Sequence, residues 1–155
     1  MSASEVTIEK VEQTTIAYIR EVVPGYEAIP AHIGEIVAYL EKNKVAPTGP
    51  PFVMYWDEAH KEKDADIETA FPIAGPIPSG DRVKVRAFPG TEQAASLTLE
   101  GSYEGLRDAY RQLLGWIRAN RYRIVGPPRE VYLKGGPDCE PSEYLTKIQF
   151  PVVKR

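Results

Sequence analysis

The sequence is poor in the residues that disulfides, metal sites and membrane spans require. Its single cysteine, Cys139, excludes an internal disulfide and a cysteine-based zinc site. The two histidines, His32 and His60, are far apart and lack the spacing of a helical metal pair, so we expect no metal and no other cofactor. No apolar run approaches the roughly 20 residues of a membrane helix. The N-terminus lacks the basic start and apolar run of a secretory signal, so the expected location is cytoplasmic.

Positive charge is not in excess either. The formal net charge is −3, which argues against nucleic-acid binding through a dense field of Lys and Arg. The hydrophobic content of 43% and the charged content of 26% are ordinary for a globular protein, and 155 residues can bury a core. We therefore expect a single domain over residues 1–155.

The most informative feature that is present is an internal repeat. Gly49-Pro50-Pro51 recurs as Gly126-Pro127-Pro128, and Tyr55 and Tyr132 follow at the same spacing. Upstream pairs at this spacing are Asn43 with Asn120, Ile36 with Leu113, and Leu40 with Ile117. Downstream, Phe71-Pro72 recurs as Phe150-Pro151 at a slightly longer spacing. The shared order predicts two copies of one unit, over about residues 14–73 and 93–152.

Each copy is predicted to be a strand–helix–strand–strand unit. Alternating apolar residues predict strands over residues 6–12 and 14–23, and the apolar spacing from Ile33 to Leu40 predicts a helix over 30–43. Strands are expected over 52–56 and 67–73, joined by a solvated charged loop over 57–66. In the second copy we expect strands over 82–89, 94–99, 130–133 and 144–152, and a helix from 101 to about 120. The fold class is therefore α+β with antiparallel sheets, helices on one face, pseudo-two-fold symmetry and a ligand cleft between the copies.

The strand after the second Gly-Pro-Pro contains an unexpected carboxylate. Side chains alternate across a sheet, so Val131 and Leu133 share one face, which we expect to pack on the helix. Glu130 and Tyr132 then share the open face, where Tyr55 is the counterpart in the first copy. Glu130 is either a solvent-facing residue or part of a site, and the pattern alone does not decide between them.

Polar side chains on the last strand of each copy are expected on the same open face. These are Glu68 in the first copy and Lys147 in the second. Lys147 is a candidate partner for Glu130, and the ordinary alternative is a surface ion pair worth under about 1 kcal/mol. An aromatic cleft with one carboxylate suits a flat, apolar, often cationic ligand.

These segments resemble a known family. The order GPPREVYL followed by DCEPSEYLTKIQFPV is similar to the gyrase-inhibitor-like family, which is also the effector-binding domain of multidrug-sensing bacterial transcription activators. The resemblance covers about Val6 to Val153 and implies paired strand–helix–strand–strand units. Because the duplicated unit uses nearly the whole chain, we expect a stand-alone member without a DNA-binding domain.

The resemblance also implies site residues. The family has a glutamate at the floor of its drug pocket, and the matching position is Glu130, with Tyr132 two positions further on. Aromatic residues near the start of the second helix line such pockets, and Tyr103 and Tyr110 are similar. The family frequently has a second acidic residue on the final strand, where this sequence has Lys147.

The resemblance implies three functions. The first is the binding of hydrophobic, aromatic and in some cases cationic small molecules, for sensing or sequestration. The second is hydrolysis of cyclopropane-bearing electrophilic natural products with Glu130 as the catalytic group. The third is a protein-interaction module of the gyrase-inhibitor type. We expect a small-molecule partner, no direct contact with nucleic acid or membrane, and no protein partner that the sequence identifies.

Overall fold

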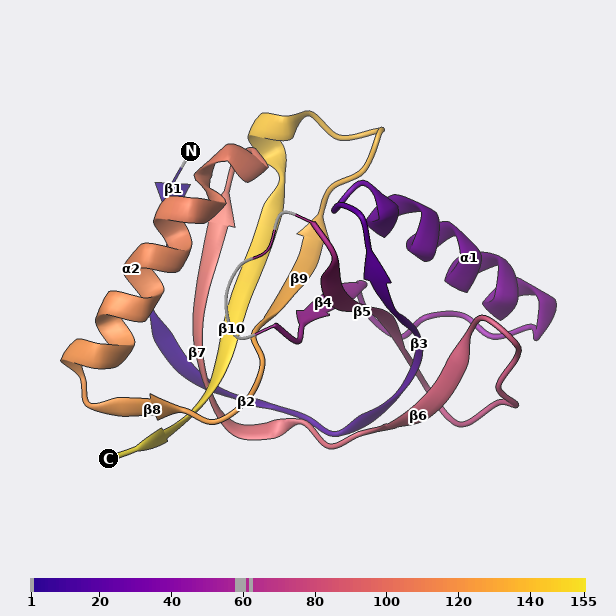
Figure 1. Cartoon of the computed structure of the whole chain (residues 1–155), viewed down its shortest axis with the longest axis horizontal. Helices are drawn as coiled ribbons and strands as arrows, with labels where there is room; N and C mark the ends of the chain where they lie inside the picture. Colours follow the sequence, from indigo (N-terminus) through magenta and orange to yellow (C-terminus); the bar gives the residue numbers. More distant parts are fainter. Residues whose placement is uncertain (1, 58–60, 62) are drawn as a thin grey trace. The chain divides into compact units, whose positions relative to one another are not determined.

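The computed structural model describes residues 2–57, 61 and 63–155, and its elements group into two compact units (Figure 1). Unit 1 contains Met1–Val11 and Thr91–Arg155, and unit 2 contains Glu12–Gly90. Both units combine antiparallel strands with one long helix, so the α+β prediction is confirmed. Part of the expected charged loop over residues 57–66, including His60, lies outside the described residues.

Unit 2 has four strands in the order β6–β3–β5–β4, all antiparallel. Its elements are β3 (Thr14–Val23), α1 (Ala28–Lys42), β4 (Phe52–Tyr55), β5 (Ala65–Ile73) and β6 (Lys84–Phe88). The buried residues of α1 are His32, Ile36 and Leu40, which recur at helical spacing and pack on one face of this sheet.

Unit 1 repeats this order as β2–β7–β10–β9. Its elements are β1 (Ser2–Ala3), β2 (Thr7–Val11), β7 (Thr91–Glu100), α2 (Leu106–Ala119), β8 (Tyr122–Ile124), β9 (Arg129–Lys134) and β10 (Leu145–Lys154), with short 3-10 turns at Tyr103–Gly105 and Pro141–Glu143. Ala109, Leu113 and Ile117 form the buried stripe of α2. The sequence predicted neither β1 nor β8, while the other elements agree to within a few residues.

Both helices end in the same way, which explains the repeated asparagine. The side-chain amide of Asn43 donates to the Tyr39 carbonyl at 2.8 Å, and that of Asn120 donates to the Trp116 carbonyl at 2.9 Å. The next residue adopts a left-handed conformation in each case, with φ of 58° at Lys44 and 61° at Arg121. The Tyr39 and Trp116 carbonyls also accept from the backbone amides of Asn43 and Asn120, so each asparagine side chain adds a second hydrogen bond at the end of its helix.

The Gly-Pro-Pro and Phe-Pro segments are repeated because they contact each other. The amide before each glycine donates to the carbonyl of the strand proline, from Thr48 to Pro72 and from Val125 to Pro151, at 2.9 Å in both units. A Cβ on Gly126 would lie 2.9 Å from the ring of Pro151, which is too close for any other residue. The two motifs therefore hold the end of each helix-to-strand connection against the last strand.

The outer strand of each unit comes from the other half of the sequence. β2 precedes β3 in the chain but pairs with β7 of unit 1, and β6 precedes β7 but pairs with β3 of unit 2 (Figure 1). Ile8 lies opposite Ala95, and Val85, its counterpart at the repeat spacing, lies opposite Ala17. The first strand of each sequence repeat is thus exchanged between the two units. Residues 6–12 were expected to begin the first copy, but β2 belongs to unit 1, so that expectation is wrong. Superposition of the copies about a two-fold axis and the single-domain assignment stay predictions.

This exchange of strands predicts which unit is destabilised when a side chain of an outer strand is shortened. Ile8→Ala removes a side chain that packs on the core of unit 1, and Val85→Ala does so in unit 2. Each side chain is partly buried, so we expect a loss on the order of 1–2 kcal/mol, below that of a fully buried residue. In native-state hydrogen exchange, Ile8→Ala should speed exchange in β7 and spare β3, and Val85→Ala should do the reverse. Faster exchange in β3 on Ile8→Ala would contradict the strand assignment.

Candidate functional site

The face on which Glu130 lies follows from the pairing of β9 with β10. Glu130 lies opposite Ile148, and Tyr132 lies opposite Thr146. Directly opposed residues project to the same face of a sheet, and Ile148 belongs to the core that packs on α2. Glu130 and Tyr132 therefore point to the helix face, and the prediction that they occupy the open face is wrong.

The alternate residues of β9, Val131 and Leu133, show why the sequence pattern was misleading. Val131 lies opposite Lys147 on the face away from α2, and Leu133 is 44% exposed. An apolar pair marks the helix side only where a helix covers the strand. The core residues under α2 extend along β10 as far as Ile148. Past Ile148, the same face of the sheet carries Tyr132, which lies opposite Thr146.

The Glu130 carboxylate is held by two tyrosine hydroxyls. Tyr110, on α2, donates to one oxygen at 2.6 Å, and Tyr132 donates to the other at 3.0 Å. Glu130 itself is only 6% exposed. Tyr103 contacts the Tyr132 ring edge to face at 6.1 Å between centroids, and Tyr144 contacts Tyr103 at 5.0 Å. We call Tyr103, Tyr110, Glu130, Tyr132 and Tyr144 the tyrosine–glutamate cluster.

The cluster has a buried part, the Glu130 carboxylate, and an exposed edge, the Tyr103 ring. Tyr103 is 44% exposed, whereas Glu130 is buried. Partial burial raises the pKa of the Tyr103 hydroxyl, and the neighbouring Tyr144, Glu130 and Cys139 groups raise it further. The cluster thus presents aromatic surface near solvent and a carboxylate beneath it. Such an arrangement can bind a ring by its face and a positive charge by the carboxylate.

Tyr55 lies in unit 2, in a pair that matches part of this cluster. Its ring meets Tyr26 edge to face at 5.9 Å and 77°, and Tyr103 meets Tyr132 at 6.1 Å and 73°. Tyr55 lies opposite Ile67 in register, on the helix face of its sheet, so the open-face prediction is wrong for Tyr55 too. The carboxylate occurs in unit 1 alone, because Val53 stands where unit 1 has Glu130.

Glu68 lies on the open face of unit 2, as predicted, and its charge is compensated there. Trp56 Nε1 donates to one oxygen at 3.0 Å, and Arg86 donates to the other at 2.5 Å. Arg86 also lies over the Tyr18 ring at 5.1 Å, and Arg20 lies over Trp56 at 4.2 Å. Glu68 is 1% exposed, so this ion pair belongs to the fold of unit 2.

Lys147 does not pair with Glu130, so that prediction is wrong. It lies on the open face of unit 1, where its Nζ donates to Glu9 Oε1 at 2.9 Å. The strand itself separates it from the Glu130 carboxylate. Of the seven predicted site residues, the structure brings together Tyr103, Tyr110, Glu130 and Tyr132. Tyr55 and Glu68 belong to unit 2, and Lys147 lies on the opposite face of the unit 1 sheet.

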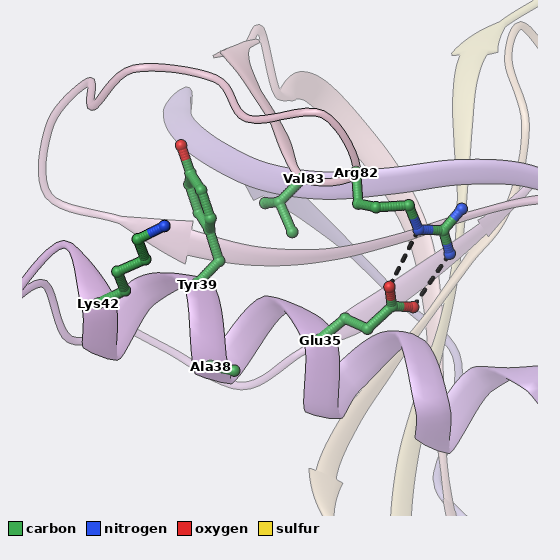
Figure 2. A pocket seen from close by; sticks show the side chains of 6 residues that line it. All are labelled: Glu35, Ala38, Tyr39, Lys42, Arg82 and Val83. Atoms are coloured by element: carbon green, nitrogen blue, oxygen red, sulfur yellow. Dashed lines mark hydrogen bonds and ion pairs between the residues drawn. The ribbon is translucent and has the colours of Figure 1, made fainter.

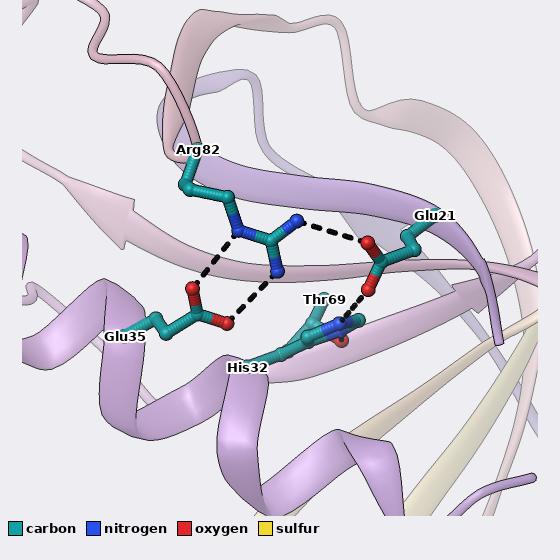
Figure 3. Close-up of polar contacts among 5 residues, drawn as sticks. All are labelled: Glu21, His32, Glu35, Thr69 and Arg82. Carbon is teal, nitrogen blue, oxygen red and sulfur yellow. Dashed lines mark hydrogen bonds and ion pairs between the residues drawn. The ribbon is translucent and has the colours of Figure 1, made fainter.

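In unit 2 a carboxylate, a buried histidine and a hydroxyl are linked in the same order as in a hydrolytic triad (Figure 3). His32 Nε2 lies 2.7 Å from Glu21, and its Nδ1 lies 3.2 Å from the Thr69 hydroxyl. Arg82 bridges Glu21 at 2.9 Å and Glu35 at 3.0 Å. Thr69 is 0% and His32 is 2% exposed, so a substrate cannot reach the hydroxyl. This network therefore connects α1 to β3 and β5 and does not form a nucleophile.

A surface hollow of about 320 Å³ lies beside the same network (Figure 2). Tyr39, Ala38 and Val83 form its apolar side, and Glu35, Arg82 and Lys42 form its polar side. Glu35 and Arg82 pair with each other at the surface. None of the predicted site residues lines this hollow.

Two tyrosines were missed in the sequence: Tyr144 of the tyrosine–glutamate cluster, and Tyr26, the ring partner of Tyr55 in unit 2. Tyr26 precedes Tyr103 by the spacing that separates the two Gly-Pro-Pro segments, so the repeat already paired them. Tyr144 has no such signal, since it enters through the long connection before β10.

Among the described residues, no group of three or more His, Cys, Asp and Glu side chains is arranged for a metal ion. Neither described helix is long and apolar enough to cross a membrane.

Comparison with known proteins defines the class. A sequence profile of the GyrI-like small molecule binding domain matches residues 4–153. The chain therefore belongs to the GyrI-like family of small-molecule-binding domains, as its resemblance predicted. No curated protein matches the sequence significantly.

Solved structures agree with this assignment. The EcmrR C-terminal domain superposes with a TM-score of 0.91 at 25% identity, over 100% of both chains. EcmrR in its complex with DNA matches with a TM-score of 0.89 at 25% identity, and this chain spans 58% of that chain's length and is itself covered to 97%. SAV2435 bound to tetraphenylphosphonium shares the fold, with a TM-score of 0.59 at 13% identity over 97% of this chain and 94% of that one.

One buried hydroxyl at the cluster yields a stability prediction. Thr146, opposite Tyr132, has 0% exposure, and its Oγ1 has no hydrogen-bond partner among the described residues. Thr146→Val removes that unsatisfied group at similar shape and should raise the free energy of unfolding by about 1 kcal/mol. Thr69→Val is the control, since it removes the hydroxyl that contacts His32 and should lower stability by about 1 kcal/mol. Urea denaturation of both variants measures the difference, and a less stable Thr146→Val would contradict the prediction.

Proposed function

We propose that the tyrosine–glutamate cluster of unit 1 binds hydrophobic, ring-containing cations. The observation that carries this proposal is the buried Glu130 carboxylate, held by Tyr110 and Tyr132 with Tyr103 at the rim. We further propose that residues 1–155 act as one small-molecule-binding domain, for sensing or sequestering such compounds.

The physical argument rests on what the cluster offers to a ligand. A carboxylate removed from water carries a desolvation cost of several kcal/mol, which a bound positive charge offsets. Tyrosine rings give a ligand apolar contact area, and their faces attract a cation. The two hydroxyl donors fix the carboxylate in one orientation, so that a ligand does not have to order it.

The family comparison supports the same class of ligand. Tetraphenylphosphonium, which SAV2435 binds, is a cation wrapped in four aromatic rings. That protein shares the fold at 13% identity, so its ligand is a suitable probe for this chain. Lys147 does not oppose a cation at Glu130, since it is paired with Glu9 on the other face of the sheet.

Hydrolysis is the second candidate, because Glu130 is a carboxylate with hydroxyl donors beside it. Each Glu130 oxygen accepts one hydrogen bond from a tyrosine and keeps a second lone pair, which a general base would have to direct at a water. Binding is the better-supported function, because the matching family model is that of a small-molecule-binding domain. If mass spectrometry showed turnover of a cyclopropane-bearing alkylator, hydrolysis would become the better-supported function.

The binding proposal predicts a charge-dependent loss in a Glu130→Gln variant. Tetraphenylphosphonium and tetraphenylborate have the same shape and opposite charge. By isothermal titration, Glu130→Gln should weaken the cation by about 1.5–3 kcal/mol, or about 10- to 150-fold, and leave the anion unweakened.

The matched control is Glu140→Gln, which makes the same charge change at an exposed position in the β9–β10 connection. It should change the affinity for the cation less than twofold. Equal affinities of the wild type and Glu130→Gln for tetraphenylphosphonium would show that the site lies elsewhere.

A further inference from the structure

Behind the tyrosine–glutamate cluster, on the face of the sheet away from α2, lies a second polar group. Glu9 on β2 accepts from Lys147 at 2.9 Å and from the Gln149 amide at 2.7 Å. The Gln149 carbonyl oxygen accepts from Arg129 Nε at 2.7 Å, and its amide also lies 3.1 Å from Ser96. We call Glu9, Ser96, Arg129, Lys147 and Gln149 the back-face network.

This network connects the N-terminal strand to the strand that bears the carboxylate. Glu9 is on β2, Gln149 is on β10, and Arg129 is on β9 directly before Glu130. Two hydrogen bonds therefore lead from β2 across β10 to the residue next to the cluster.

Charge reinforces the connection. Burial alone would raise the pKa of the Glu9 carboxyl, but Lys147, Ser96 and Gln149 hold it below its usual value. Desolvation lowers the pKa of Arg129 to about 10, and the negative charge of Glu9 opposes that fall. Glu9 thus remains an anion, and it favours the charged form of the guanidinium beside Glu130.

Unit 2 offers an internal comparison. The positions of Glu9 and Lys147 correspond there to Arg86 and Glu68, which form the same ion pair with the charges exchanged. The positions of Arg129 and Gln149 correspond to Phe52 and Ala70, which face each other in the same register. The ion pair is therefore common to both units, whereas the polar link to the carboxylate strand occurs in unit 1, the unit with Glu130.

We infer that Glu9 is a positioning residue for the Glu130 site. Through Gln149 and Arg129 it fixes the part of β9 from which Glu130 and Tyr132 project toward α2. Because thermodynamic coupling is reciprocal, a ligand at the cluster also stabilises the pairing of β1 and β2 with β7. The N-terminal strands then report whether the site is occupied. This inference rests on the proposed binding function.

The test uses the whole chain, with tetraphenylphosphonium as the probe. Glu9→Ala should weaken tetraphenylphosphonium by about fivefold or more, the lower end of usual coupling. Glu5→Ala removes the same charge from an exposed position on the same segment and should change the affinity less than twofold. Lys147→Met breaks the ion pair but keeps the Glu9–Gln149–Arg129 link, so it too should have less than a twofold effect.

Hydrogen exchange supplies the readout that a merely structural role would not move. Saturating tetraphenylphosphonium should slow amide exchange in β2 of the wild-type chain by about fivefold or more, and the slowing should disappear in Glu9→Ala. This measurement also covers the case in which a variant is poorly folded, since the wild-type comparison alone tests the coupling.

The outcomes separate the two proposals. If tetraphenylphosphonium binds in a Glu130-dependent way, but Glu9→Ala binds it equally and β2 exchange does not change, the positioning role is overturned and the binding function stands. If the cation does not bind, or binds the wild type and Glu130→Gln equally, both proposals fall.

Discussion

The pairing of β9 with β10 is the constraint on which the candidate site depends. Because Glu130 lies opposite Ile148, its side chain shares a face with the core under α2, and a shift of one residue would turn it to the other face. The same pairing sends Arg129 and Val131 to the back of the sheet. One register thus creates both a carboxylate among tyrosines on one side and a hydrogen-bonded link to the N-terminal strand on the other.

The duplicated unit was predictable from sequence because its repeated motifs are geometric necessities. Gly126 must be glycine where the ring of Pro151 approaches it, and the Asn120 side chain adds a hydrogen bond at the end of α2. Both residues have a counterpart in the other copy, Gly49 and Asn43. The family and the fold class followed from the same segments. Tyr103, Tyr110 and Tyr132 were also correctly grouped with Glu130, although their role in binding is a proposal.

Other features could not be predicted, for physical reasons. An alternating strand has two phases, and Val131 and Leu133 are apolar without being covered by the helix, so hydrophobicity alone selected the wrong phase. The partner of Lys147 was missed because Glu9 lies near the other end of the sequence and reaches it through strand exchange, which no local pattern reveals. The buried His32 and Thr69 looked like ordinary helix and strand residues, since their contact depends on the packing of α1 on β5.

The exchange of outer strands means that a sequence repeat and a folded unit are different pieces of this chain. A cut after Gly90 would separate the two sequence halves, yet it would leave β1 and β2 on the fragment that lacks β7. The other fragment would expose the edge of β7 as a row of backbone groups without partners, the kind of edge that aggregates. A fragment that carries unit 1 intact has to join residues 91–155 to residues 1–11, in that order or the reverse. Duplication therefore left two halves that can no longer be separated where their sequences meet.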